Sequence, residues 1–209
     1  MPSMIEKTLL PIALDADLLE QQLQQEDALL RGHFRLSSGL HSDTYVQCAR
    51  FLRQPELAAP AAAALARQIQ AAGLQLDTVV GPAMGGVVIG YELARQLGVP
   101  GIFTERDADG QMTLRRGFTV TPGERLIIAE DVVTTGKSTL EVARVLREMG
   151  AEVLAVASLI DRTGGQVGLD FPHFALLPVQ AATFAPESCP LCAAGVPVIK
   201  PGSRPEKAF

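Results

Sequence analysis

Two carboxylates and a run of hydroxyl-bearing and glycine residues follow one another in the stretch LIIAEDVVTTGKST, at positions 126–139. Its last part, Gly136-Lys137-Ser138, also occurs at the end of a nucleotide-binding P-loop. That loop has the pattern G-x-x-x-x-G-K-[ST], which requires a first glycine at position 131. The residue there is Asp131, whose carboxylate would repel phosphate oxygens. The stretch is therefore not predicted to bind a triphosphate.

The same stretch suits one phosphate group that is attached to a sugar. Residues 134–138 open a predicted helix, so hydroxyls and backbone N–H groups at a positive helix end can bind a single dianionic phosphate. Glu130 and Asp131 supply acceptors for neighbouring sugar hydroxyls. An ordinary capped helix after two surface acids is the alternative, and the Glu-Asp pair favours the sugar-phosphate site over it.

Three further stretches have residue types that could complete such a site. The glycines of GPAMGG, at 81–86, would let backbone amides face an anion, although a plain strand-to-helix turn has the same composition. Arg162 could bind a planar carboxylate through two parallel hydrogen bonds, or pair with Asp161 on the surface. Ser37-Ser38-Gly39, taken alone, is simply a turn.

The elements that must position these residues alternate between helix and strand. Such alternation predicts an α/β protein with an open, mostly parallel sheet, in which ligands bind at the carboxyl ends of the strands. Helices are expected at 56–73, 86–97 and 138–149, and strands at 77–81, 101–104, 126–130 and 153–160.

The ends of the chain are expected to lie outside this sheet. Leucines at helical spacing predict a helix over 15–31 with Gly32 as its stop, and a turn-rich segment follows. We therefore divide the chain into an N-terminal helix and substrate-binding hood (1–55), an α/β core (56–190) and a C-terminal tail (191–209).

Composition excludes several classes of protein. The 209 residues carry a net charge of -5, with no run of Lys or Arg, so nucleic-acid binding is not expected. No apolar run is long enough to span a membrane, and the N-terminus lacks a cleavable signal. Three cysteines do not describe a disulfide framework, which indicates a reducing compartment, and we expect a cytoplasmic protein.

Four motifs, in order along the chain, resemble those of the type I phosphoribosyltransferases, and in particular the orotate-using members. AEDVVTTGKST (129–139) closely matches the phosphoribosyl-pyrophosphate signature, and GPAMGG (81–86) resembles the pyrophosphate loop. HFRLSSGLHSDTYVQ (33–47) resembles the N-terminal substrate segment, and SLIDRTGG (158–165) the strand end that carries an orotate-contacting arginine. The resemblance covers about residues 30 to 165.

This resemblance implies a fold, a reaction and partners. The fold would be a type I phosphoribosyltransferase-like open, mostly parallel sheet flanked by helices, with a small N-terminal hood. The reaction would transfer ribose 5-phosphate from phosphoribosyl pyrophosphate to orotate, giving orotidine 5′-monophosphate and pyrophosphate in pyrimidine synthesis. A homodimer is implied, with Mg²⁺ on the pyrophosphate and ribose oxygens and no dedicated protein metal site. A transferase for another base, and a regulator that binds without turnover, are the alternatives.

The resemblance also assigns roles residue by residue. Glu130 and Asp131 would bind the ribose hydroxyls, Arg162 would contact orotate, and Lys137 is the least certain member of the phosphate loop. The 5′-phosphate loop comprises Val132, Val133, Thr134, Thr135, Gly136, Lys137 and Ser138. The pyrophosphate loop comprises Ala83, Met84, Gly85 and Gly86, and the base pocket adds Ser37, Ser38 and Gly39.

One loop departs from the family pattern. Many members carry Arg-Lys, a second Lys and a His in a mobile catalytic loop, whereas TERDADGQMTLRRGF (104–118) has Glu105-Arg106 there and no Lys or His. We hypothesise that Arg106, Arg115 or Arg116 neutralises the leaving group instead. Ser37 also replaces a common lysine, so the base is less well determined than the sugar phosphate.

Cys189 and Cys192 form a single CxxC pair, which by spacing is half of a structural zinc site. One pair cannot supply four ligands, although a dimer could bring two pairs together, and incidental thiols are the favoured interpretation. His33 and His41 lie in the turn-rich segment, where a lone histidine is usually structural or solvated.

Overall fold

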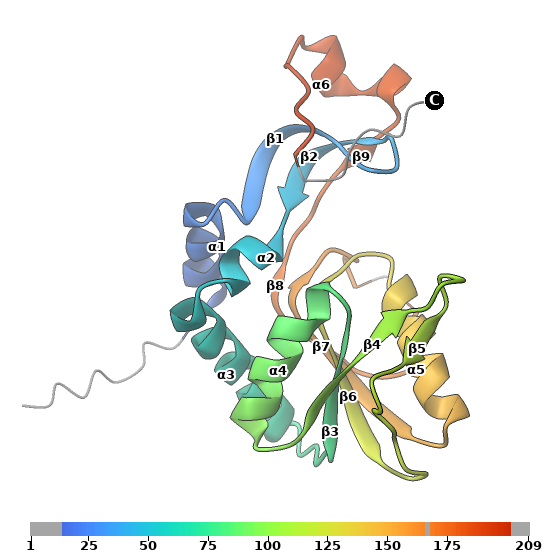
Figure 1. The fold of residues 1–209 in the computed structure, drawn as a ribbon. Coiled ribbons are helices and arrows are strands. Elements are labelled where there is room, and N and C mark those ends of the chain that lie inside the picture. Colours follow the sequence, from blue (N-terminus) through green and yellow to red (C-terminus); the bar gives the residue numbers. More distant parts are fainter. Residues whose placement is uncertain (1–13, 166–167, 202–209) are drawn as a thin grey trace, which may run out of the picture.

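A six-stranded, mostly parallel sheet forms the centre of the computed structural model, which describes residues 14–165 and 168–201 (Figure 1). Its strand order is β5-β4-β3-β6-β7-β8, and only the β4–β5 pair is antiparallel. This arrangement confirms the predicted fold class. The strands are β3 (Thr78–Pro82), β4 (Gly101–Arg106), β5 (Met112–Leu114), β6 (Arg125–Val133), β7 (Glu152–Asp161) and β8 (His173–Pro178).

Successive strand residues point to opposite sides of this sheet, so its strands present buried apolar side chains on both faces. Helices cover both faces. Val79 of β3 packs in one hydrophobic cluster with α3 (Pro55–Ala71) and α4 (Gly85–Leu97). Its neighbour Val80 packs in the other cluster, with α5 (Lys137–Glu148). Both clusters consist of buried, mostly aliphatic side chains, so the sheet is a well-packed platform for the loops at its carboxyl edge.

A small antiparallel sheet lies beyond the carboxyl edge of the central one, at the top of Figure 1. It consists of β1 (Leu29–Arg35), β2 (His41–Val46) and β9 (Thr183–Phe184), and the short α6 (Pro190–Ala193) follows β9. We call this unit the hood. Phe34 also forms a β-bridge with Ile199, so both ends of the described chain meet in it. The predicted domain boundaries remain a prediction.

Three expectations from the sequence need correction. The first helix, α1, spans only Ala16–Gln25, because Asp27 adopts a left-handed φ of 50° and Leu29 enters β1 instead. Strand β6 runs on to Val133, since Val132 still pairs with Ile160, so Glu130 and Asp131 are strand residues. Strand β8 was not predicted.

The remaining helix of the N-terminal region, α2 (Cys48–Leu52), joins the hood to α3. Phe51 is fully buried and belongs to the same hydrophobic cluster as α3 and α4. The link between hood and core is therefore packed at this point. Among the described residues, no helix has the length and hydropathy needed to cross a membrane.

Candidate active site

A polar cleft of about 220 Å³ opens where β3 and β6 end. It brings two stretches predicted from the sequence into one site, although they lie more than 40 residues apart. Thirteen residues line it: Pro82, Ala83, Gly85, Glu130, Asp131, Val132, Val133, Thr134, Thr135, Gly136, Lys137, Ser138 and Thr139. Of the predicted pyrophosphate loop, Met84 is instead 82% exposed and Gly86 is buried behind the cleft lining.

A larger cleft of about 450 Å³ lies elsewhere, between α1, α3 and Leu176 of β8. Its described lining is mostly aliphatic and holds no glycine, and the α1 N-terminus that reaches it is already capped by the Asp15 carboxylate. Size alone would select this cleft, but the chemistry of the lining residues selects the smaller one.

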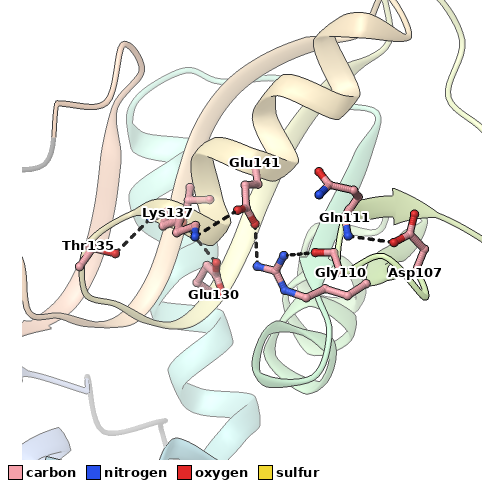
Figure 2. Close-up of polar contacts among 9 residues, drawn as sticks. Asp107, Gly110, Gln111, Glu130, Thr135, Lys137 and Glu141 are labelled. Atoms are coloured by element: carbon pink, nitrogen blue, oxygen red, sulfur yellow. Dashed lines mark hydrogen bonds and ion pairs between the residues drawn. The ribbon is translucent and has the colours of Figure 1, made fainter. Parts of the chain in front are cut away.

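The phosphate loop leaves backbone donors available at the start of α5. Gly136 caps the helix with a left-handed φ of 70°, and no side chain caps the first N–H groups. The weak contact from the Lys137 amide to Thr135 Oγ1, at 3.4 Å, is internal to the loop (Figure 2). Free amides at a positive helix end are suited to bind an anion.

Glu130 is buried at the base of the cleft. Its Oε1 accepts a hydrogen bond of 3.2 Å from the Thr139 hydroxyl, one turn into α5. Burial, helped by the neighbouring Asp131 charge, raises the pKa of Glu130 to about 8, although the Thr139 hydroxyl acts in the opposite direction. With this pKa, the carboxyl group keeps its proton near neutral pH. A ligand that donates hydrogen bonds to it would stabilise its ionised form.

Asp131 has a different environment one residue further on. Burial raises its pKa, and hydrogen bonds from the backbone amides of Val132 and Asp131 itself counteract that rise. The Val132 amide donates to Oδ1 over 2.8 Å. Asp131 is thus positioned by its own backbone, and its carboxylate is held against the pyrophosphate loop.

Glycine is required where that loop meets β6. A side chain at Gly85 would overlap the Asp131 carboxylate, and one at Gly86 would overlap the carbonyl oxygen of Ala129. A side chain at Gly81 would overlap the backbone of Gly86. The turn between β3 and α4 therefore packs backbone to backbone, and its Ala83–Met84 peptide bond is cis.

Arg162 lies at the carboxyl end of β7, beside the phosphate loop. Its amide donates to the carbonyl of Val133 over 2.8 Å, which fixes its place next to the last residue of β6. Burial lowers its pKa, and the Asp43 charge partly compensates. Its buried Nε has no hydrogen-bond partner within the described part of the chain. A buried, unpaired guanidinium nitrogen is costly and points to an anionic ligand.

Two cations beside the cleft share one carboxylate. Glu141 of α5 accepts a hydrogen bond of 2.6 Å from Arg106 Nη2 and lies 3.9 Å from Lys137 Nζ (Figure 2). Arg106 also donates to the Gly110 carbonyl over 2.6 Å. Arg106 is therefore tied to the same helix that carries the phosphate loop, although it does not line the cleft.

Arg115 and Arg116 lie on the same hairpin and are both paired with Glu105, at 3.5 Å and 3.0 Å. The guanidinium of Arg116 also stacks 5.7 Å from the ring centroid of Phe103. Neither arginine lines the cleft. Both must exchange the Glu105 contact for a substrate contact if they take part in the reaction.

Ser37, Ser38 and Gly39 form the turn between β1 and β2 and are not part of the cleft lining. The Leu40 amide donates to Ser38 Oγ over 3.4 Å, and Gly39 has a φ of 87°. The structure thus places this predicted base segment in the hood. The sugar-phosphate residues lie in the core.

Sequence reasoning missed two lining residues. Pro82 precedes the predicted anion loop, and Thr139 follows the predicted phosphate loop directly. Thr139 had a visible signal, because it is the fourth hydroxyl of TTGKST and lies one helical turn after Gly136. Its role as a donor to Glu130 depends on the bend between β6 and α5, which the motif alone does not show.

Comparisons with known proteins agree with this geometry. The model of the phosphoribosyl transferase domain family matches residues 48–187. An orotate phosphoribosyltransferase of Carboxydothermus hydrogenoformans is 53% identical over 180 residues, which are 86% of this chain and 94% of the relative. One of Caldicellulosiruptor bescii is 48% identical over 191 residues, covering 91% and 99%. The crystal structure of orotate phosphoribosyltransferase from Aeropyrum pernix superimposes with a TM-score of 0.65 at 26% identity, covering 77% of this chain and 93% of that one.

Proposed function

The chain belongs to the phosphoribosyltransferase family, and we propose that it is an orotate phosphoribosyltransferase. It transfers ribose 5-phosphate from phosphoribosyl pyrophosphate to orotate, giving orotidine 5′-monophosphate and pyrophosphate for pyrimidine synthesis. The observation that carries this proposal is the single cleft in which a carboxylate pair, a phosphate loop and a glycine turn meet. The curated relatives that match most of the chain have the same activity in their names.

The β6–α5 junction is assigned to the sugar phosphate. Residues 132–138 wrap the 5′-phosphate with backbone amides and hydroxyls, while Glu130 and Asp131 accept hydrogen bonds from the ribose hydroxyls. These acceptors and donors line one cleft, as the binding of one phosphorylated sugar requires. Gly85 packs against Asp131. The pyrophosphate loop is therefore proposed to lie beside the carbon of the sugar that carries the leaving group.

The reaction needs positioning and charge stabilisation more than a nucleophile. Orotate nitrogen attacks the anomeric carbon as the bond to pyrophosphate breaks, and positive charge develops on the sugar ring. The Asp131 carboxylate beside the ring stabilises that charge, and Glu130 contributes once the donors of the bound substrate favour its ionised form. Fixed backbone donors hold both phosphate groups in place. Each role falls on a group whose position is already set by β6, α4 or α5.

Mg²⁺ fits the same cleft. The lining residues offer carboxylate, hydroxyl and carbonyl oxygens, and of the described lining residues none offers an imidazole or a thiolate. Such donors suit a hard cation that keeps most of its ligands from substrate oxygens and water. We propose that Asp131 and Glu130 orient the sugar oxygens that bind the ion. When bound, Mg²⁺ would neutralise charge on the departing pyrophosphate.

Arg162 is proposed to recognise the orotate carboxylate. Its guanidinium is half-buried beside the phosphate loop, and its Nε, although closed to solvent, has no hydrogen-bond partner among the described residues. Arg162 does not line the cleft, so a small side-chain movement would bring it to the ligand. Ser37, Ser38 and Gly39 would complete the pocket from the hood. Arg106, Arg115 and Arg116 are proposed to replace the missing loop lysine, with Arg106 the first candidate because Glu141 already holds it beside α5.

The assembly is also a proposal. We expect a homodimer in which a loop of one chain reaches the site of the other, as the family resemblance implies. Light scattering of the purified protein checks this expectation.

A parallel assay of several bases tests the activity. Phosphoribosyl pyrophosphate and Mg²⁺ are incubated with orotate, uracil, adenine or hypoxanthine, and pyrophosphate release is followed together with the ultraviolet spectrum of the base. Turnover of orotate alone is expected. Turnover of another base would replace the proposal by a different transferase, and tight phosphoribosyl-pyrophosphate binding with no turnover of any base would favour a regulator.

A further inference from the structure

Four side chains with metal-binding atoms meet in the hood, far from the phosphate cleft. His33 and His41 come from β1 and β2, and Cys189 and Cys192 flank the first turn of α6. One ligand atom from each lies within 4.8 Å of all the others. The CxxC pair that the sequence showed as half of a zinc site is thus joined by two histidines about 150 residues away.

The distances between these atoms are close to those of a tetrahedral zinc centre. With Zn–S bonds of about 2.3 Å and Zn–N bonds of about 2.05 Å, a nitrogen and a sulfur ligand lie roughly 3.6 Å apart. His33 Nε2 lies 3.5 Å from Cys189 Sγ and 3.7 Å from Cys192 Sγ, and His41 Nδ1 lies 3.3 Å from Cys192 Sγ. The two imidazole nitrogens, 2.8 Å apart, must separate by about 0.5 Å to reach the tetrahedral spacing.

The second nitrogen of His33 is already fixed as a donor. His33 Nδ1 lies 2.7 Å from the carbonyl oxygen of Val196, which can only accept a hydrogen bond. The proton is therefore on Nδ1, and Nε2 presents its lone pair to the cluster. Metal-binding histidines are held in the same way by a backbone carbonyl or carboxylate behind the ring.

Most of the hood lies outside the hydrophobic clusters of the core, which it joins through Leu29 and Val46 at the ends of β1 and β2. Of the residues that the structure describes, none in 30–45 or 183–199 belongs to either hydrophobic cluster of the core. Strand β9 contributes only two residues to its sheet. Small units of this kind commonly depend on a metal ion for stability. Three of the four side chains are buried, His33 at 2% exposure, Cys189 at 3% and His41 at 7%.

We propose that His33, His41, Cys189 and Cys192 bind one Zn²⁺ in a closed, structural Cys₂His₂ site. Two thiolates and two imidazoles select zinc over Mg²⁺, and four protein ligands leave no position for catalysis. This proposal replaces the prediction of no protein metal site and of incidental thiols at Cys189 and Cys192. The ion ties the C-terminal segment to the β1–β2 hairpin.

A consequence follows for the base pocket, and it rests on the proposed function. His33 and His41 lie on the two strands of one hairpin, and its turn carries Ser37, Ser38 and Gly39. Zinc binding would fix the distance between the two strands at the base of that turn. Loss of zinc should therefore weaken orotate binding through a misplaced turn and leave phosphoribosyl-pyrophosphate binding nearly unchanged.

Metal analysis of the full-length protein tests the site independently of activity. The chain is purified with a thiol reductant and without chelators, and bound metals are measured by mass spectrometry. We expect about one zinc per chain in the wild type, and a large loss of zinc in Cys192→Ser and His41→Ala. Cys48→Ser is the control, because Cys48 is the third cysteine of the sequence and lies outside the cluster, and it should retain zinc.

Wild-type protein provides a second readout if the variants fold poorly. Replacing zinc by Co²⁺ should give the intense visible bands of a tetrahedral cobalt site and a thiolate charge-transfer band, and a strong chelator should lower Tm. Wild-type protein with only trace metal that also fails to bind added Zn²⁺ or Co²⁺ would overturn the proposal. Finding a Cys189–Cys192 disulfide that persists under reducing conditions would also overturn it.

Kinetics test the consequence for the base. Cys192→Ser should raise KM for orotate severalfold while KM for phosphoribosyl pyrophosphate stays within about twofold. Unchanged KM values in a protein that has lost its zinc would refute the link to the base pocket. No turnover by zinc-loaded wild-type protein would refute the proposed function and leave the metal site intact.

Discussion

The phosphate cleft and the hood are built in opposite ways. In the cleft, one continuous segment from Glu130 to Thr139 supplies most of the lining, and the Thr139–Glu130 hydrogen bond spans nine residues. In the hood, the contacts join segments that lie far apart in the sequence. Strand β9 pairs with β2, and the hydrogen bond between His33 and Val196 joins residues 163 positions apart. The cleft is supported by a buried sheet, whereas the hood relies on a few long-range contacts.

This difference suggests that the two regions have different roles in the proposed reaction. The groups proposed to stabilise charge lie on the β6–α5 junction, and the turn proposed to contact the base lies on the hood. Changes in the cleft should therefore affect all chemistry, while changes near Arg162 or the hood should affect orotate selectively. The variants below test that distinction.

Gly85→Ala is expected to have the largest effect. Its new methyl group would overlap the Asp131 carboxylate, so either the carboxylate or the pyrophosphate loop must move. Displacement of this kind should lower kcat/KM by about a hundredfold. Gly168→Ala is the control, because a side chain there meets open space, and steady-state rates should stay near wild type. A Gly85→Ala enzyme of normal activity would show that the loop does not contact substrate.

Arg162→Ala should follow, with an effect confined to orotate. A charge-assisted hydrogen bond contributes about 1.5–3 kcal/mol, so kcat/KM for orotate should fall roughly 10- to 150-fold. Arg162→Lys should recover little, since lysine cannot form two parallel hydrogen bonds. Arg147→Ala, which removes an exposed ion pair with Asp170, should have no effect. Equal losses for both substrates would contradict the assignment of Arg162 to the base.

Asp131→Asn should lower kcat/KM by about tenfold or more, because the ribose hydroxyls lose a charged acceptor. The fold should be intact, since the amide oxygen can still accept from the Val132 amide. Asp77→Asn is the matched control, because Asp77 is an exposed aspartate paired with Arg125 before the start of β3. Circular dichroism together with initial rates distinguishes lost chemistry from lost structure.

Glu130→Gln is expected to have the smallest effect, on stability and its pH dependence. Folded Glu130 has a pKa of about 8 against an ordinary value of 4.5, so the native state holds a proton that the unfolded state releases between those values. The contribution of this group to stability is therefore lost as pH rises through that window.

Thermal melts of the ligand-free protein between about pH 5 and pH 8 check this sign. The Tm of Glu130→Gln minus the Tm of the wild type should increase as pH rises. The wild type loses the contribution of Glu130 over this range, whereas glutamine does not titrate. Glu148→Gln, at an exposed position of α5, should show no such trend. A constant Tm difference across the range would mean that the pKa of Glu130 is not raised.

The core was predictable because its signals are local. Helical spacing followed by a glycine placed α4 and α5 within one residue of their observed bounds, and the phosphate site followed from neighbouring residue types. The hood was not predictable in this way. The two histidines and two cysteines meet only because residues from both ends of the chain pair across β1, β2 and β9.

Local signals also misled where tertiary contacts decide the outcome. Leu29 and Leu30 continued the helical spacing of α1 but pair with β2 in the structure. Strand β8 lacks a clear alternation, since most of its side chains are half-buried at the edge of the sheet. The extension of β6 through Asp131 depends on pairing with β7, which no pattern within 126–139 reveals.

Binding of phosphoribosyl pyrophosphate alone tests the central claim most directly. Isothermal titration calorimetry with Mg²⁺ and without orotate compares wild type, Asp131→Asn and Arg162→Ala. Our account predicts that Asp131→Asn binds about tenfold more weakly or worse, and that Arg162→Ala binds as the wild type does. Unchanged affinity in Asp131→Asn, or an equal loss in both variants, would contradict the assignment of the sugar phosphate to the β6–α5 cleft.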